Sequence, residues 1–464
     1  MLTRTPMPDI LHVPYTYFPD SAGGTETYVA ALIRGLRRQG VTSAVASPVD
    51  RGQPREYVHD GAAVYRFESS GSRLPLEAQY GDGDPVAAEA FAALLRTRRP
   101  RLVHLHGWTS GISLRMLRAA HDAGMPVVHT YHTPSVSCAR GTLMLYGRDV
   151  CDGQLFVDRC TRCVLQQRGV PLPISAVLGQ MPVAVGRAMR RFELAGGPWT
   201  ALRMTELIHE RHRAFRSLLA EADHLVAVQD WVYELLAFLG APPDKLSVSR
   251  LALPGFDATS DSSGGRERAP GQPVRMAYFG RLERIKGVHV AVAAVEALAG
   301  ANIALDVYGA PQGREGEEYL QELRGAAARD PRVRILPPVP STDVVDRMRD
   351  HDLVVVPSIW METGPLVVPE ALAAGVPVIG SARGGIPSFI RNGVDGQLVA
   401  PGDLGAWTAA IKRLVDEPGF LETLRSGVRP PETMDRVVDE MLDIYGRVLG
   451  EPLGTRRTWH AGCS

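Results

Sequence analysis

Short apolar runs alternate with helical patterns along two separate stretches of the chain, and this alternation restricts the fold more than any other feature. In the first stretch the apolar runs lie at 10–13, 102–105, 126–131 and 224–228, and a helical pattern at 25–39 follows the first of them. Apolar runs separated by helices are typical of βαβ units. They predict a parallel sheet with helices on both faces.

A second series of apolar runs follows a polar, glycine-rich segment at 260–273, which we interpret as a linker. Its runs lie at 274–279, 303–307, 333–336, 353–356 and 376–379. We therefore predict an α/β protein with two doubly wound, Rossmann-like domains at 1–259 and 274–430. Ligands bind beyond the carboxyl ends of strands in such sheets, so we expect the two domains to face each other across a cleft.

Two further segments stand outside this alternation. Residues 135–217 interrupt the first series with a cysteine-rich part and a helical part, and are predicted to be an insertion. Residues 431–464 should form a C-terminal helix at 433–449 and a loose tail. The sequence leaves open whether this helix crosses back to the first domain.

Charge and hydropathy exclude two classes of protein. Lys and Arg number 51 and Asp and Glu number 51, which argues against a nucleic-acid partner. No uncharged apolar stretch reaches the roughly 18 residues of a membrane-spanning helix, and the first residues do not read as a secretory leader. We expect a cytoplasmic protein, and contact with the inner face of the membrane stays open.

Two cationic residues, Arg281 and Lys286, follow the first apolar run of the second series. Gly280-Arg281-Leu282 follows the apolar run at 274–279, and Lys286-Gly287 comes four residues later. An Arg fork and a Lys point charge at a strand end suit a diphosphate. The alternative is a solvated loop with two surface charges.

A second candidate site runs from Glu362 to Glu370, after the apolar run at 353–356. Pro365 fits the first turn of a helix, whose free N–H groups near Gly364 would attract an anion. Glu370 can accept hydrogen bonds from both hydroxyls of a ribose, and Glu362 can face a sugar. The alternative is an ordinary helix start with acidic residues.

Taken together, these motifs resemble the retaining glycosyltransferases of the GT-B, family-4 type (glycosyl transferases group 1). The resemblance covers most of the chain. It is carried by Gly23-Gly24, Gly280-Arg281-Leu282, Lys286-Gly287, the E-x7-E segment 362–370, the segment 371–378 and Gly384-Gly385-Ile386-Pro387.

This resemblance implies a hexosyltransferase that moves a sugar from a UDP-, GDP- or ADP-sugar to an unidentified glycan, lipid-linked or small-molecule acceptor with retention of configuration. It implies that Arg281 and Lys286 bind the donor diphosphate and that no cofactor takes part in catalysis. The other implied donor-binding residues are Gly23, Gly24, Gly280, Glu362, Thr363, Gly364, Pro365, Leu366 and Glu370.

By the same resemblance, His132 contacts the donor sugar from the first domain. His104, His106 and His129 compete with it for that role. Two other functions stay open on this fold: a nucleotide-sugar epimerase or phosphorylase, and a catalytically silent, metal-binding scaffold.

Four of the five cysteines lie within the insertion, as Cys138-x12-Cys151-x8-Cys160-x2-Cys163. In a cytoplasmic chain such spacing indicates a metal site rather than disulfide bonds. Four thiolates predict a structural zinc site. The alternatives are free buried cysteines, a redox pair and an iron–sulfur cluster.

Overall fold

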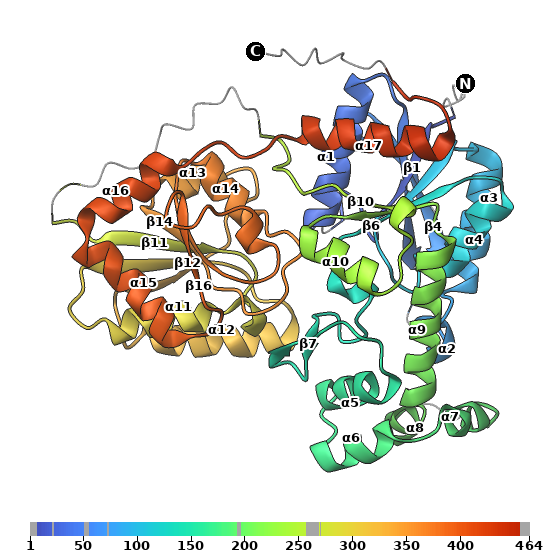
Figure 1. The fold of residues 1–464 in the computed structure, drawn as a ribbon, viewed down its shortest axis with the longest axis horizontal. Coiled ribbons are helices and arrows are strands. Elements are labelled where there is room, and N and C mark those ends of the chain that lie inside the picture. The colour runs from blue at the N-terminus through green and yellow to red at the C-terminus, as the bar shows by residue number, and fades with distance from the viewer. Residues whose placement is uncertain are drawn as a thin grey trace. The chain divides into compact units, whose positions relative to one another are not determined.

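The computed structural model describes residues 7–20, 23–50, 55–71, 74–192, 196–256, 269 and 271–454. The chain divides into two compact units: unit 1 comprises Met1–Pro254 and Met434–Ser464, and unit 2 comprises Gly255–Thr433. Each unit contains its own largely parallel sheet (Figure 1), which confirms the predicted α/β class. Most of the predicted linker, residues 260–268 and 270, lies outside the described residues.

Unit 1 is built on an eight-stranded sheet with the order β10-β9-β6-β5-β1-β2-β4-β3. All neighbouring strands are parallel except β3 and β4. The strands are β1 (Ile10–Val13), β2 (Ser43–Asp50), β3 (Glu56–His59), β4 (Ala62–Ser69), β5 (Leu102–Leu105), β6 (Val127–Tyr131), β9 (His224–Ala227) and β10 (Leu246–Val248).

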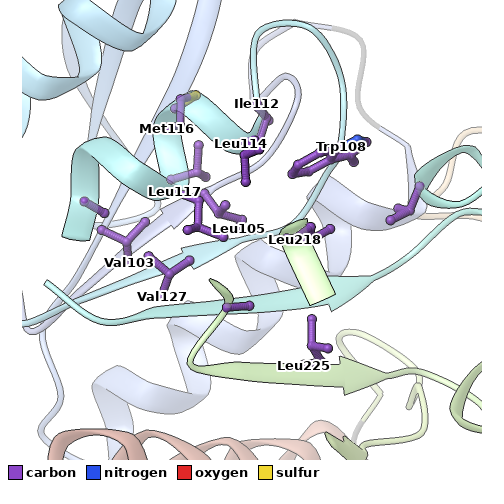
Figure 2. Packing of buried hydrophobic residues seen from close by; sticks show 14 of the residues in the cluster. Val103, Leu105, Trp108, Ile112, Leu114, Met116, Leu117, Val127, Leu218 and Leu225 are labelled. Atoms are coloured by element: carbon purple, nitrogen blue, oxygen red, sulfur yellow. The ribbon is translucent and has the colours of Figure 1, made fainter. Parts of the chain in front are cut away.

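Helices cover both faces of this sheet. One core includes strand residues such as Leu105 and Val127, together with residues of four helices (Figure 2); these are α3 (Pro85–Arg98), α4 (Leu114–Asp122), α9 (Met204–Glu221) and α10 (Asp230–Phe238). Side chains alternate along a strand, so His104, between Val103 and Leu105, points to the other face and meets Tyr445 of α17 (Met434–Leu449). Helix α17 packs against α1 (Gly24–Arg38).

The predicted insertion forms a small lobe around the start of α9 (Figure 1). Its own core is made by Val164, Leu165, Met204, Leu207 and Ile208. The lobe contains the hairpin β7 (Met144–Leu145) and β8 (Asp149–Val150) and the helices α5 (Val157–Gln167), α6 (Leu172–Gly179), α7 (Val183–Arg190) and α8 (Gly197–Leu202). The remaining short helices of unit 1 are α2 (Leu76–Tyr80), η2 (Pro134–Val136) and η3 (Pro243–Lys245).

Unit 2 has a six-stranded, fully parallel sheet with the order β13-β12-β11-β14-β15-β16. The strands are β11 (Val274–Phe279), β12 (Ile303–Tyr308), β13 (Val333–Leu336), β14 (Leu353–Val356), β15 (Val378–Ser381) and β16 (Gly396–Val399). The helices are η4 (Arg284–Lys286), α11 (Val288–Ala297), α12 (Gly313–Ala327), α13 (Val344–Arg349), α14 (Val367–Ala373), η5 (Ile386–Ser388), α15 (Leu404–Asp416) and α16 (Pro418–Gly427).

The start of β15 corrects the predicted run at 376–379. Gly375, at φ +74°, ends helix α14 in the left-handed conformation, and the N–H of Val376 donates to the carbonyl of Ala371 at 2.9 Å. This bonding caps the helix in the manner of a Schellman motif. Val376 therefore belongs to the helix cap, and the strand begins at Val378.

Among the described residues, no helix combines the length and the apolar character needed to cross a membrane.

Asp306 of β12 joins three strands of the unit 2 sheet through one buried carboxylate. Arg334 of β13 donates two hydrogen bonds to it, each of 2.6 Å, Arg275 of β11 donates one of 3.2 Å, and Nε2 of His351 lies 3.0 Å away. Burial alone would raise the pKa of Asp306, but the hydrogen bonds from His351 and Arg334 and their charges hold it well below its usual range. The carboxylate is therefore ionised.

We expect Asp306→Ala to lower the free energy of unfolding of the protein by about 1–3 kcal/mol, because it leaves the buried His351 and the partly buried Arg275 without their shared acceptor. Chemical denaturation measures this loss. The control is Asp346→Ala, since the Asp346 side chain is 77% exposed and its removal should change stability by no more than about 0.5 kcal/mol. Equal effects of the two substitutions would contradict a central role for Asp306.

Candidate active site

Lys286 and Glu362 form the central contact between the loops that follow β11 and β14. Nζ of Lys286 lies 2.7 Å from Oε1 of Glu362, and the hydroxyl of Ser358 donates to the same oxygen at 2.8 Å. Glu362 is only 5% exposed. Burial alone would raise the pKa of Glu362, but the charge and hydrogen bond of Lys286 and the Ser358 hydrogen bond help to lower it. Glu362 is therefore held as a carboxylate.

Two glycine motifs allow these loops to pack closely. Gly287 has φ +71°, and a Cβ there would lie 2.0 Å from the carbonyl oxygen of Pro357. Gly384 has φ +59°, and a Cβ there would lie 2.6 Å from the backbone of Glu362. The N–H of Gly385 donates to the carbonyl of Glu362 at 2.7 Å. No role was predicted for Gly384 and Gly385 beyond their part in the family resemblance, although a glycine pair is itself a signal of close backbone packing.

Arg281 lies beside these loops, after the end of β11. Gly280, at φ +151°, donates its N–H to the carbonyl of Tyr308 at 3.1 Å, which joins this turn to the end of β12. Nη1 of Arg281 donates to Glu283 and to Gln312, each at 2.9 Å, and the side chain is 47% exposed. These partners hold the guanidinium at the carboxyl edge of the sheet, where an anion could compete for it.

Helix α14 begins at Val367, so Pro365 does not lie in its first turn as predicted. The carbonyl of Pro365 instead accepts the N–H of Val368 at 3.2 Å in the turn before the helix, since Leu366 is already helical in conformation. The N–H groups of Gly364 and Leu366 have no acceptor among the described residues. Glu370 lies in the first turn, and burial raises its pKa to about 7.

His132 belongs to a row of four buried histidines: His12 lies in β1, His104 in β5, His106 just after β5 and His132 just after β6. Nδ1 of His106 lies 3.1 Å from Nε2 of His132, and Nε2 of His106 lies 3.0 Å from Nδ1 of His12. The ring of Tyr28 on α1 meets His132 edge-on at 5.0 Å. His12 was not among the predicted residues, because nothing in its local sequence separates it from an ordinary strand residue.

The buried row is uncharged. Burial lowers the pKa of His12 and of His132 to about 3 and that of His106 well below its usual value. Nitrogens of His12, His104 and His106 lie within 4.8 Å of one another, which a metal ion could bridge. Both nitrogens of His104 are already hydrogen-bonded, to Tyr445 and Thr130 at 2.6 and 2.7 Å. The hydrogen bonds therefore account for this cluster without a metal.

His129, the remaining candidate for the contact with the donor sugar, is buried within unit 1. Burial lowers the pKa of His129 to about 4, although hydrogen bonds with the backbone of Gly107 and of His129 oppose this. Its ring packs edge-on against Trp108 at 6.3 Å. His106 therefore contacts His132 directly, whereas His104 and His129 hold neighbouring parts of the sheet.

Gly23 and Gly24 lie at the start of helix α1. Gly23 is the N-cap residue, with an extended backbone at φ −104°, and its N–H donates to Oε2 of Glu26 at 2.8 Å. Glu26 thus caps the helix from within its first turn. The conformation of Gly23 does not itself require glycine.

An open polar cavity of about 720 Å³ lies at the carboxyl edge of the unit 1 sheet. Its lining comes from the segment after β1, the last residues of β2 and β4, the segment at 71–84 and the segment after β5. It includes Tyr15, Asp20, Ser69, Gln79 and Ser110. Hydroxyl, amide and carboxylate groups of this kind can bind a molecule rich in hydroxyls.

The four predicted metal ligands lie together in the insertion lobe of unit 1. Cys138, Cys151, Cys160 and Cys163 all line one small cavity of the insertion lobe, and none forms a disulfide.

Comparisons with known proteins match both units. Residues 23–251 match the model "Glycosyl transferase 4-like domain", and residues 264–429 match "Glycosyl transferases group 1". A D-inositol 3-phosphate glycosyltransferase of Salinispora tropica is 34% identical over 98% of this chain and 86% of its own length.

Solved structures match the fold. Sucrose-phosphate synthase from Thermosynechococcus elongatus has a TM-score of 0.64 at 19% identity, over 95% of this chain and 99% of that one. Anabaena HepE in complex with UDP-glucose has a TM-score of 0.56 at 16% identity, over 95% of this chain and 98% of that one.

The raised pKa of Glu370 gives a test that needs no ligand. A carboxyl group whose pKa is higher in the folded state than in the unfolded state stabilises the fold. For Glu370 this stabilisation is complete below the unfolded pKa of 4.5 and is lost as the pH rises through the folded pKa of about 7. Because glutamine does not titrate, we expect the Glu370→Gln variant not to lose stability in this way as the pH rises. Between pH 5 and pH 8 the stability of the variant should therefore rise relative to the wild type, with a slope of at most about 1.4 kcal/mol per pH unit.

Urea denaturation at several pH values measures the slope. The control is Glu318→Gln on α12, whose partner Arg314 is 89% exposed and whose own side chain is 67% exposed. Parallel pH profiles for wild type and Glu370→Gln would contradict a pKa near 7.

Proposed function

The chain belongs to the group 1 glycosyl transferases, with the GT-B fold, and is a glycosyltransferase; we propose that it transfers a sugar from a nucleoside-diphosphate sugar to a hydroxyl group with retention of configuration. The observation that carries the proposal is the group of side chains at the carboxyl edge of the unit 2 sheet. It combines two cations, Arg281 and Lys286, with two carboxyl groups, Glu362 and Glu370.

Arg281 and Lys286 are suited to bind the diphosphate of the donor. Lys286 is paired with Glu362 and Arg281 with Glu283, so both charges are held in place by the protein itself. Such preorganised cations stabilise the negative charge that develops on a leaving diphosphate. The free N–H groups of Gly364 and Leu366 add donors for an anion or a sugar hydroxyl.

Glu370 suits the ribose of the donor. A carboxylate accepts hydrogen bonds from two neighbouring hydroxyls, and its pKa of about 7 predicts that donor affinity rises with pH through neutrality. Anabaena HepE is titled as a complex with UDP-glucose, which supports a nucleotide sugar of this kind as the donor. A UDP-, GDP- or ADP-sugar fits these groups equally, because they contact no part of the base.

The chemistry of Glu362 supports the proposal of retention. Inversion would require a base that takes the proton of the attacking hydroxyl. Glu362 is a weak base, because its pKa is lowered and Lys286 occupies one of its oxygens. We therefore infer that the leaving phosphate accepts this proton and that acceptor and phosphate share one face of the sugar.

For the acceptor we propose a hydroxyl-rich molecule bound in the polar cavity of unit 1, beside Tyr15 and Ser110. The relative from Salinispora tropica is named for an inositol phosphate, so D-inositol 3-phosphate is the first soluble acceptor to test. The insertion lobe favours a different class, an acceptor anchored in a membrane.

Helices α6 and α7 of the lobe present an apolar and basic surface, which we call the α6–α7 surface. Leu172, Ile174, Val177 and Phe192 are 53–72% exposed there. Residues 171–192 contain Arg187, Arg190 and Arg191 and no acidic residue. Arg187 and Arg190 lie 3.7 Å from Glu210 and Glu206 of α9 and remain 55–56% exposed. Helices with exposed apolar side chains and arginines bind at the surface of anionic bilayers. We propose that this surface holds the enzyme on the cytoplasmic face of the membrane.

We expect Arg281→Ala and Lys286→Ala each to reduce transfer about 10²–10³-fold, the effect of losing one preorganised charge. The assay measures release of nucleoside diphosphate and the matching glycoside from a panel of nucleotide sugars. The control is Arg284→Ala in the same turn, because Arg284 is 60% exposed and pairs with Glu322; its turnover should stay near the wild-type rate. Near-normal turnover in the first two variants would overturn the donor site, and an inverted anomeric proton signal in the product would overturn retention.

We expect the protein to sediment with vesicles that contain phosphatidylglycerol and not with phosphatidylcholine vesicles. The double substitution Ile174→Asp/Val177→Asp should abolish sedimentation, because both side chains would carry charge into the bilayer interface. The control is Phe238→Asp at the end of α10, which is also 61% exposed and lies outside the α6–α7 surface. Binding that survives the double substitution would contradict the proposal.

A further inference from the structure

The cysteine-bearing part of the insertion lobe has the arrangement of a small metal-binding motif. Cys138 precedes the hairpin β7–β8 and Cys151 follows it, so the two chain ends of the hairpin carry one thiol each. Cys160 and Cys163 are three residues apart on helix α5 and therefore lie on the same face of that helix. The hairpin and the helix thus supply two thiols each.

All four thiols line one cavity of about 30 Å³. We propose that this cavity binds one zinc ion through Cys138, Cys151, Cys160 and Cys163, as a structural site without a role in the transfer reaction. Binding replaces four S–H protons by four Zn–S bonds and releases the protons to solvent, which leaves a site of net charge −2. A cavity of this size holds a single ion, whereas an iron–sulfur cluster needs room for several atoms.

The surroundings of the cavity can balance that charge. Nη1 of Arg140 donates to the carbonyl of Cys163 at 3.3 Å, and Arg159, which directly precedes Cys160 on α5, lines the same cavity. The N–H of Tyr146 donates to the sulfur of Cys163 at 3.2 Å. Guanidinium groups and an N–H directed at sulfur stabilise thiolates.

The hairpin β7–β8 is short, so a metal ion would add to the few contacts that hold it, such as the hydrogen bond from the Tyr146 N–H to the sulfur of Cys163. Each of its strands has only two residues, and an isolated hairpin is marginally stable in water. Among the described residues, no three of the four sulfur atoms lie within 4.8 Å of one another, whereas Zn–S bonds are about 2.3 Å long. Zinc would therefore draw the hairpin and helix α5 together.

The experiment uses the full chain, purified without chelator from cells grown with zinc. Elemental analysis should find about one zinc per chain. Cys160→Ser and Cys163→Ser should each lose most of it, and Cys463→Ser, a substitution outside the described residues, should retain it. If a serine variant does not fold, the wild-type protein provides a second test. After its zinc has been removed and Co²⁺ added, it should show the visible absorption of a tetrahedral cobalt–thiolate centre.

Three outcomes would overturn the proposal. If the purified protein contains no metal and does not bind Co²⁺, the four residues are ordinary cysteines that bind no metal. Iron with acid-labile sulfide would replace zinc by a cluster. Zinc that survives all four cysteine substitutions would place the metal elsewhere in the chain.

Discussion

The ion pair between Lys286 and Glu362 is the constraint on which the candidate donor site depends. Lys286 leaves the end of β11 and Glu362 lies in the loop after β14, and these two strands are neighbours in the sheet. The pair can form only because Gly287 and Gly384 leave room for the backbone of the opposite loop. A buried carboxylate without such a partner would take up a proton, so the pair fixes both the geometry and the charge of this edge.

The strands whose bounds could be predicted from the sequence are short runs in which apolar residues outnumber polar ones. β1, β5, β11, β13 and β14 have the predicted bounds. β2 was missed because its sequence, Ser-Ala-Val-Ala-Ser-Pro-Val-Asp, mixes small and polar residues with a proline. Its strand character comes from pairing with β1 and β4 on either side, which is a tertiary effect that local propensity does not contain.

The site was predictable in its residues and not in its contacts. Motif order pointed to Arg281, Lys286, Glu362 and Glu370, because each follows a strand end. The pairing of Lys286 with Glu362 joins residues 76 positions apart, and the histidine row joins three strands. Such contacts follow from strand order, which the apolar runs alone do not specify. The raised pKa of Glu370 likewise depends on burial by distant residues.

Helix α17 gives unit 1 a discontinuous chain. Tyr445 hydrogen-bonds His104, 341 residues earlier in the sequence, and α17 covers α1. Unit 2, by contrast, is one continuous stretch from Gly255 to Thr433. During synthesis the ribosome therefore releases all of unit 2 before the last helix of unit 1 exists. The domain that begins first therefore waits for its last packed helix, and the nascent protein must keep the α1 face of its first sheet uncovered until α17 has been synthesised.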